Sequence, residues 1–269
     1  MDINFDIRKS TSFKIGGQIA RMYFPTSIEE FVEIKTKEPV ICTKKMDSIK
    51  FDGNTVFAGA GVRGTKLSKL ALEKEFSGLE FMVAFPGSVG GEVFMNAGAH
   101  GQMIADVLKS AKVYCPEKGV ITLTNADMEF SYRTSICQKM PYSVLEAEFV
   151  LTQSTTDKIQ EKMNENLSFR QNKQPSLTLP NCGSTFRNPA GDSAGRLLDA
   201  AGAKVYVWEN HANFIINDGE GTSLDVLRLM DEMYSRVKEK FNVELKPEVR
   251  YLGGNNEEEV KICRKLKML

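Results

Sequence analysis

The chain has 269 residues, and its 35 Lys and Arg balance its 35 Asp and Glu, so its formal net charge is zero. This balance argues against a protein that binds nucleic acid by neutralising phosphates, which needs a basic excess or a basic face. No apolar run approaches the roughly 18–20 residues of a membrane-spanning helix, and the N-terminus lacks the apolar core of a secretory signal. We therefore expect a cytoplasmic protein with no nucleic-acid or membrane partner.

The cysteines and histidines argue against a disulfide framework and against a metal site. The five cysteines are odd in number, and no two of them form a CxxC pair. The two histidines, His100 and His211, lie far apart in the sequence, and there is no HExxH motif. We expect no bound metal.

The hydrophobic pattern alternates between the period of a strand and that of a helix. It predicts strands at 19–24, 39–42, 54–58, 111–115, 119–124, 143–151 and 212–216. It predicts helices near 27–35, after the glycine turn that ends at Gly64, and at 155–172, 193–201 and 223–241. The composition becomes more polar and richer in Pro, Gly and Ser from about residue 153, so we expect domains at 1–152 and 153–254. The charged tail, 255–269, is expected to be a peripheral helix or a frayed end.

Gly59–Gly64 matches the GxGxxG pattern between a predicted strand and a predicted helix. A dinucleotide-binding fold would also place an acidic residue about 20 positions further on, at the end of a second strand. Glu80 instead stands at the start of its apolar run. A tight strand-to-helix turn is therefore favoured over an NAD-dependent dehydrogenase, which would require a parallel sheet.

The segment 78–101 holds six glycines in an otherwise apolar stretch. It cannot form one long helix, because glycine costs about 1 kcal/mol at each interior helical position. Closely spaced glycines leave backbone N–H groups uncovered, and such groups bind anions, including phosphates. A wall against a bound nucleotide and a glycine-rich packing loop are equally compatible with this pattern.

Three polar positions are candidates for chemistry, each beside a simpler interpretation. Arg133 is a fixed cation suited to a carboxylate, although most single arginines lie on the surface. Ser184 is not in a GxSxG elbow, so it is either a proton donor to a strongly basic carbanion or a turn serine. Glu248 and Arg250 share one face of a predicted short strand, where a structural ion pair is favoured over a pocket rim.

Several motifs occur together in one order: TSFKIGG (11–17), GLEFMVAFPGSVGGEVFMNAGAHG (78–101), FSYRTS (130–135), RQNKQP (170–175), PNCGSTFRNPAGDSAGRLLDAAGA (180–203), ENHANFIIN (209–217) and PEVRYLG (247–253). Over residues 10–253 the chain resembles the UDP-N-acetylenolpyruvoylglucosamine reductase (UDP-N-acetylmuramate dehydrogenase, MurB) family, in its shorter type. The resemblance implies an α+β fold, with an FAD-binding (PCMH-like) N-terminal domain and a MurB-type substrate domain.

The resemblance also implies the activity and its residues. It implies a flavoenzyme of peptidoglycan precursor synthesis, in which NADPH reduces FAD and FAD reduces the enolpyruvyl ether of a UDP-sugar. The implied catalytic residues are Arg133, Ser184 and Glu248. The residues implied to line FAD are Pro86, Gly87, Ser88, Gly90, Gly91, Asn96, Ala97 and Gly98. The residues implied to contact the substrate are Tyr132, Lys173, Asn188 and Arg250.

Two departures from the family pattern are visible. The glycine-rich GxGSN loop that wraps the FAD diphosphate is missing between 40 and 54, where Lys44 and Lys45 are the available cations. The connection between Ala203 and Glu209 is also shorter than usual. An alternative function is therefore a MurB-like protein that binds a UDP-sugar without redox turnover.

Overall fold

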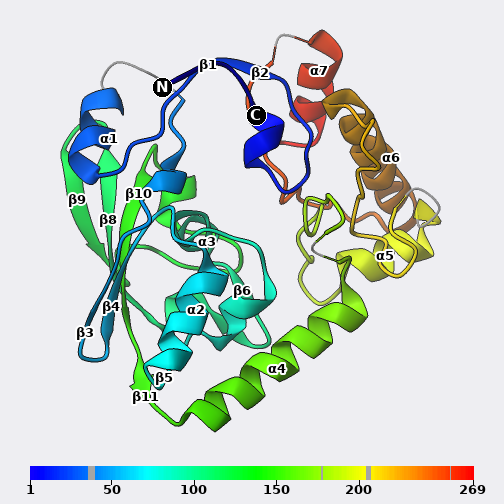
Figure 1. The fold of residues 1–269 in the computed structure, drawn as a ribbon. Coiled ribbons are helices and arrows are strands. Elements are labelled where there is room, and N and C mark those ends of the chain that lie inside the picture. The colour runs from blue at the N-terminus through cyan, green and yellow to red at the C-terminus, as the bar shows by residue number, and fades with distance from the viewer. Residues whose placement is uncertain (36–39, 177, 204–206, 255) are drawn as a thin grey trace. The chain divides into compact units, whose positions relative to one another are not determined.

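The computed structural model describes residues 1–35, 40–176, 178–203, 207–254 and 256–269. The chain forms two compact units, drawn in Figure 1. Met1–Asn4 and Ala20–Arg170 make the first unit, and Phe5–Ile19 and Gln171–Leu269 make the second. The units thus divide at Arg170, after most of one long helix, and an N-terminal segment joins the second unit. The division into domains at 152 and 254 stays a prediction.

The first unit is built on a five-stranded sheet in which every neighbouring pair is antiparallel. In spatial order its strands are β3 (Ile49–Asp52), β4 (Thr55–Gly59), β10 (Ser143–Val150), β8 (Leu108–Cys115) and β9 (Gly119–Thr124). The antiparallel order excludes the parallel sheet of an NAD-dependent dehydrogenase. Gly59–Gly64 is instead the tight turn that connects strand β4 to the following helix, as favoured from the sequence.

The remaining strands form two-stranded sheets. These are β1 (Asp2–Asp6) with β2 (Gln18–Met22), β5 (Phe76–Ser77) with β11 (Thr152–Gln153), and β6 (Gly98–Ala99) with β7 (Gln102–Met103). Of the strand expected at 39–42, residue 39 lies outside the described residues, and Ile41 makes an isolated parallel bridge with Tyr23. Strand β3 was not predicted.

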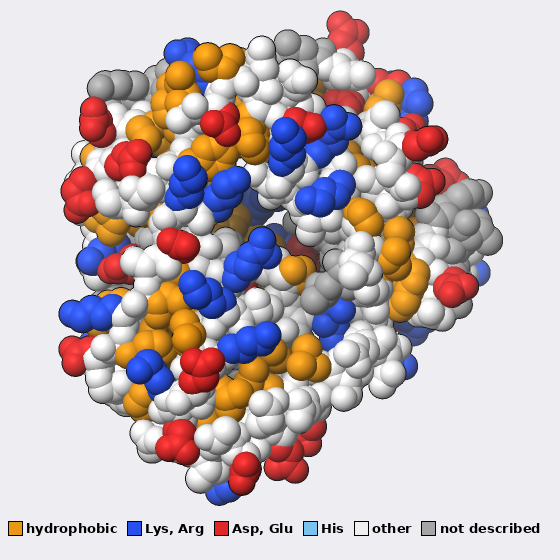
Figure 2. All heavy atoms as spheres, viewed as in Figure 1, with side chains coloured by type: hydrophobic (Ala, Val, Ile, Leu, Met, Phe, Trp, Pro, Cys, Tyr) orange, Lys and Arg blue, Asp and Glu red, His pale blue; other side chains and the backbone are white. Residues whose placement is uncertain are grey.

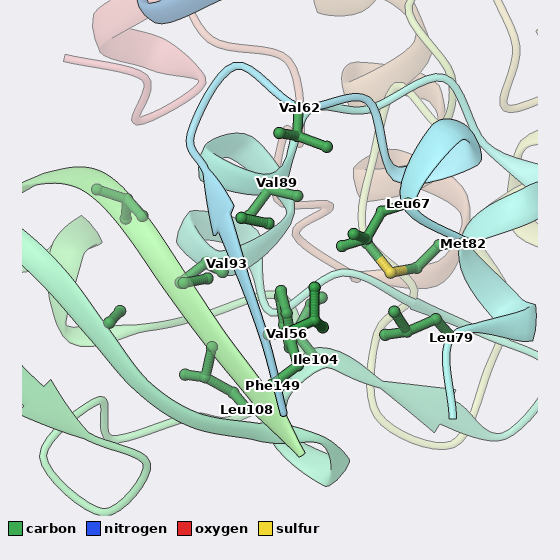
Figure 3. Packing of buried hydrophobic residues seen from close by; sticks show 14 of the residues in the cluster. Val56, Val62, Leu67, Leu79, Met82, Val89, Val93, Ile104, Leu108 and Phe149 are labelled. Atoms are coloured by element: carbon green, nitrogen blue, oxygen red, sulfur yellow. The ribbon is translucent and has the colours of Figure 1, made fainter. Parts of the chain in front are cut away.

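The helices of the first unit are α1 (Ile28–Lys35), α2 (Gly64–Glu73), α3 (Val89–Met95) and α4 (Thr156–Lys173), the last of which continues three residues into the second unit. Leu67 of α2 and Val89 and Val93 of α3 belong to one apolar cluster with Val56 of β4 and Phe149 of β10 (Figure 3). All five side chains are fully buried. The glycine-rich segment that contains α3 is therefore held on the sheet by an apolar core.

The regular elements of the second unit are mostly helices. Its helices are α5 (Ala194–Ala200), α6 (Ser223–Phe241) and α7 (Glu257–Lys265). Helix α6 has the predicted bounds, and a capping box between Thr222 and Asp225 fixes its start. The charged tail forms α7, which packs beside α6 (Figure 1) and buries Cys263 completely. The tail is therefore an ordered part of this unit's core.

The strand expected at 212–216 is absent from the described residues of this unit. Ile216 makes a single bridge with Asn181, and Pro247 makes a single bridge with Phe186 where a short strand was expected around Glu248. The reason is local, because the side chain of Asn213 satisfies the backbone of Phe186 in place of a regular ladder. These loops are held by side-chain hydrogen bonds.

The surface carries charged side chains of both signs, in keeping with the balanced composition (Figure 2). Acidic and basic side chains both occur across the face drawn in Figure 2. Among the residues that the structure describes, no helix combines the length and the apolar character needed to cross a bilayer.

Candidate functional site

Arg133 lies at the tip of a tight two-residue turn in the first unit. Ser131 and Thr134 exchange backbone hydrogen bonds of 3.1 and 3.0 Å, which leaves Tyr132 and Arg133 as the two turn residues. Arg133 has φ = +53°, in the left-handed region that costs a non-glycine residue about 1 kcal/mol or more. Strained backbone of this kind is concentrated at functional sites, because the surrounding contacts must hold it in place.

The end of helix α3 holds this turn. Asn96, which is fully buried and left-handed at the helix end, donates from Nδ2 to the Ser131 carbonyl oxygen over 2.9 Å. The hydroxyl of Ser135 and the amide of Gln138 both donate to the Phe94 carbonyl oxygen, over 2.7 and 2.8 Å. Three side chains thus fix the Arg133 turn to the glycine-rich segment.

The Arg133 side chain points at that segment. Its Nη2 donates to the Gly98 carbonyl oxygen over 2.8 Å, and its guanidinium lies 5.3 Å from the centre of the Tyr132 ring. The Tyr132 side chain is about half exposed. The Arg133 side chain therefore contacts the segment whose residues are expected to line FAD.

The backbone at 43–46 belongs to segment 40–54, in which the GxGSN loop is missing from the sequence. It forms a 3-10 turn, Thr43–Lys45, that packs on Gly59 and Gly61 so closely that a Cβ atom at Gly61 would collide with the Thr43 carbonyl oxygen. The ammonium groups of Lys44 and Lys45 lie 4.4 and 5.8 Å from the centre of the Phe24 ring. The two lysines thus share one aromatic neighbour.

Glu92 is a buried acid that the sequence analysis did not single out. It lies on α3, and its carboxyl group is wedged against Gly64 and Gly87. Neither carboxyl oxygen has a hydrogen-bond partner among the described residues. Burial raises the pKa of Glu92 to about 8, so the neutral acid prevails at pH 7.

Two buried donors on α4 also lack acceptors. Ile159, Met163, Asn166 and Arg170 form the buried stripe of this helix. Asn166 Nδ2 and Arg170 Nε have no hydrogen-bond partner among the described residues. Burial lowers the pKa of Arg170, although its guanidinium stays charged at neutral pH. A polar ligand with acceptor atoms would satisfy both groups.

The backbone segments that carry Ser184 and Glu248 are hydrogen-bonded to each other in the second unit. The N–H of Glu248 donates to the carbonyl oxygen of Thr185 over 2.8 Å, so the two segments run side by side although 64 positions separate the two candidates. Burial raises the pKa of the Cys182 thiol, and the nearby charge of Glu248 adds to the increase. The hydroxyl of Ser184 has no hydrogen-bond partner in the described part of the chain. It remains available to a substrate.

Asn213 holds the backbone next to Ser184 in place. It is buried, and its Oδ1 accepts from the Phe186 N–H over 2.9 Å while its Nδ2 donates to the Phe186 carbonyl over 2.8 Å. Its own carbonyl oxygen accepts from the Thr185 N–H over 2.9 Å. One asparagine therefore fixes the backbone on the C-terminal side of Ser184.

Asn217 does the same for the N-terminal motif, TSFKIGG (11–17). Its Nδ2 donates to the Phe13 carbonyl oxygen over 3.0 Å. The Ser12 hydroxyl also donates to the Asn181 carbonyl oxygen over 3.1 Å. The motif therefore supports the loop that leads to Ser184.

The expected substrate contacts in this unit have mixed environments. Lys173 is exposed, and its charge lowers the pKa of the half-buried His211 by a lesser amount than burial does. Asn188 accepts from the Ala194 N–H over 3.0 Å, so its oxygen supports the start of α5. Burial, followed by the charge of Arg187, lowers the pKa of Arg250, so these two cations lie near each other. Paired cations of this kind suit a polyanion such as a diphosphate.

Comparison with known proteins agrees with this architecture. The model of an FAD-binding domain matches residues 26–124, and the model of the UDP-N-acetylenolpyruvoylglucosamine reductase C-terminal domain matches 174–252. The protein is thus an FAD-binding protein of two parts.

Individual relatives define the family. The UDP-N-acetylenolpyruvoylglucosamine reductase of Latilactobacillus sakei is 42% identical over 224 residues, which cover 81% of this chain and 74% of that one. The enzyme of that name from Caldanaerobacter subterraneus is 35% identical over 93% of both chains. The crystal structure of the reductase (MurB) from Thermus caldophilus superposes with a TM-score of 0.76 at 26% identity, covering 90% of this chain and 96% of that one. The chain belongs to the UDP-N-acetylenolpyruvoylglucosamine reductase family.

The polar groups of the first unit fit FAD. Glu92, Asn166 and Arg170 are buried and hold polar atoms without partners among the described residues. FAD offers ribityl hydroxyls, a diphosphate and the polar edge of its ring as partners for such groups. None of the three is distinguishable in the sequence, because a buried polar side chain cannot be told from a surface one by its position in a helical pattern.

Proposed function

We propose that the chain catalyses the NADPH-dependent reduction of UDP-N-acetylenolpyruvoylglucosamine to UDP-N-acetylmuramate, a step of peptidoglycan precursor synthesis. The observation that carries this proposal is the match of two domain models to one chain, the FAD-binding domain at 26–124 and the reductase C-terminal domain at 174–252. Arg133, Ser184 and Glu248 are proposed as the catalytic residues. FAD, when bound, carries the hydride from NADPH to the β-carbon of the enolpyruvyl group.

Arg133 is the residue for the substrate carboxylate. Hydride addition to the β-carbon builds negative charge on the α-carbon and the carboxylate joined to it. A guanidinium that is already fixed, here on the Gly98 carbonyl oxygen, stabilises this charge without having to reorganise. Arg133 is therefore proposed as the electrostatic catalyst.

Ser184 is the proposed proton donor to the α-carbon. A neutral hydroxyl is a weak acid, but the carbanion-like α-carbon is basic enough to take its proton. Asn213 fixes the backbone after Ser184 and leaves the hydroxyl free of partners in the described structure. The proton would thus arrive from a defined position.

Glu248 is proposed to act on the same step. Its backbone is tied to Thr185, and its charge acts on the neighbouring Cys182 thiol. A carboxyl group at this place orients polar hydrogens near Ser184. Tyr132, Lys173, Asn188 and Arg250 are proposed to contact the nucleotide, the diphosphate or the carboxylate of the substrate.

The test is a pair of measurements on the purified protein. A flavin absorption spectrum reports whether FAD is bound, and NADPH oxidation that depends on the enolpyruvyl UDP-sugar reports turnover. We expect both signals. A folded protein that takes up no added FAD would contradict the proposal.

The alternative function is UDP-sugar binding without redox turnover. The observation that favours it is that segment 40–54 lacks the GxGSN loop expected from the resemblance and holds instead a turn at 43–46 that packs on Gly59 and Gly61. Binding of the UDP-sugar without NADPH oxidation, in a protein supplied with FAD, would support this alternative over the reductase.

A further inference from the structure

Glu92 occupies an unusual place in the first unit. Its side chain projects from α3, is only 3% exposed and lies against the backbone of Gly64 and Gly87. These two glycines belong to neighbouring turns that are joined by backbone hydrogen bonds, from Gly64 N–H to the Gly87 carbonyl (3.2 Å) and from Val89 N–H to the Val62 carbonyl (2.8 Å). The carboxyl group fills the space that side chains at 64 and 87 would otherwise take.

A second buried acid of the same unit shows how different this environment is. Glu80 is 2% exposed, and its carboxylate accepts from the Ser77 hydroxyl over 2.6 Å and from the Gly78 N–H over 2.8 Å. Glu92 is equally buried, but neither of its carboxyl oxygens has a partner among the described residues. An ionised carboxylate in such a place is strongly disfavoured, so Glu92 holds a proton.

Among the described residues, the segment 85–91 contains no charged residue, and Glu92 is the only charged residue of α3. Strand β10, which also packs on α3, carries Glu146 and Glu148, and these are paired with Lys112 and Lys109. At the start of α2, Arg63 and Lys66 are both exposed to solvent. Burial alone raises the pKa of Glu92, to about 8.

We propose that Glu92 must be protonated for the first unit to bind FAD tightly, so that this proton sets the upper pH limit of cofactor binding. The inference rests on the proposed function, in which Pro86–Gly101 lines FAD. Ionisation would place an unpaired negative charge next to Gly87, one of the residues proposed to line FAD, and the diphosphate of FAD is itself negative. In a site that excludes water, like charges repel strongly, because little solvent screens them.

Linkage gives the expected sign. If FAD binds the neutral acid better than the anion, bound FAD raises the pH at which Glu92 ionises. The dissociation constant of FAD is then level below about pH 8 and rises by up to about tenfold per pH unit above it. It becomes level again once the bound form also ionises.

The experiment is a titration of the apoprotein with FAD between about pH 6 and pH 10, followed by the quenching of flavin fluorescence. We compare the wild type with Glu92→Gln, which keeps the shape of the acid but cannot ionise. Glu73→Gln is the matched control, because it removes an exposed carboxylate of α2. We expect a rise in the dissociation constant above about pH 8 for the wild type and for Glu73→Gln, and a level curve for Glu92→Gln.

Two results would overturn the inference, and they differ from failure of the proposed function. If Glu92→Gln keeps the wild-type rise in dissociation constant, Glu92 is not the group responsible, although FAD binds. If the wild type binds no FAD at any pH, the proposed function fails together with the inference.

Infrared spectroscopy of the wild type tests the same point without a variant. The band of a protonated carboxyl group should disappear at a higher pH with FAD than without it. An identical midpoint in both samples would contradict the inference.

Discussion

The guanidinium of Arg133 donates a hydrogen bond to the carbonyl oxygen of Gly98 over 2.8 Å. This contact joins a left-handed turn residue to the glycine-rich segment 35 positions earlier in the chain. It uses one of the five N–H donors of the guanidinium for positioning. The fork of Arg133 is thereby oriented before any substrate arrives.

Two replacements of Arg133 should separate the effect of its positive charge from the effect of its planar hydrogen-bonding geometry. Arg133→Gln removes the cation and should slow substrate reduction by about 10²–10³-fold. Arg133→Lys keeps the charge but loses the planar fork, so its loss should be smaller. Stopped-flow reoxidation of the reduced enzyme by substrate measures both rates. Equal rates for the two variants would mean that the charge itself has no part in the step.

Ser184→Ala should affect one half-reaction only. Proton donation to the α-carbon belongs to substrate reduction, so that step should slow by about 10²–10⁴-fold. Flavin reduction by NADPH needs no such proton and should keep its rate. The two half-reactions are measured separately by the flavin absorbance. Equal slowing of both would show that Ser184 has a structural role.

The sequence predicted the elements whose periodicity is set by local burial. Helix α6 has its predicted bounds, because its apolar stripe and its cap at Thr222 both lie in the local pattern. The strand predicted at 143–151 is β10, Ser143–Val150, in which Leu145, Ala147 and Phe149 alternate with Glu146 and Glu148. The strands predicted at 212–216 and around Glu248 are wrong, because both segments form loops. The Asn213 side chain makes the hydrogen bonds to the Phe186 backbone that a neighbouring strand would otherwise make.

The candidate site was predictable in part. The motifs located Arg133, Ser184 and Glu248, and the structure ties Arg133 to the glycine segment and Glu248 to the neighbour of Ser184. The burial of Glu92 could not be predicted from the sequence, because it depends on two turns from different parts of the chain that pack against the carboxyl group. No sequence pattern states that a polar atom lacks a partner.

The stability of the apoprotein should depend on pH through Glu92. The pKa of this group is about 8 in the folded chain and has a reference value of 4.5, so between these values the folded state binds more protons than the unfolded state. The free energy of unfolding therefore falls as pH rises from about 4.5 to about 8, by on the order of 5 kcal/mol in total.

Glu92→Gln should remove this pH dependence. The variant should be more stable than the wild type near pH 8, and the difference should shrink towards pH 5. Urea unfolding of the apoprotein at several pH values measures it. Parallel stability curves for the two proteins would show that Glu92 is not neutral in the folded state.

Asn213 offers the sharpest test of the second unit, because its side chain satisfies both backbone groups of the buried Phe186. Asn213→Ala leaves that N–H and that carbonyl group without partners, so the free energy of unfolding should fall by about 2–4 kcal/mol. Asn172→Ala is the control, since Asn172 is exposed and its loss should change stability by less than about 0.5 kcal/mol. Both are measured by urea unfolding.

Because Asn213 fixes the backbone after Ser184, Asn213→Ala should also slow substrate reduction more than flavin reduction by NADPH. A variant that unfolds like the control would mean that Phe186 finds other partners and that Ser184 is positioned by some other contact.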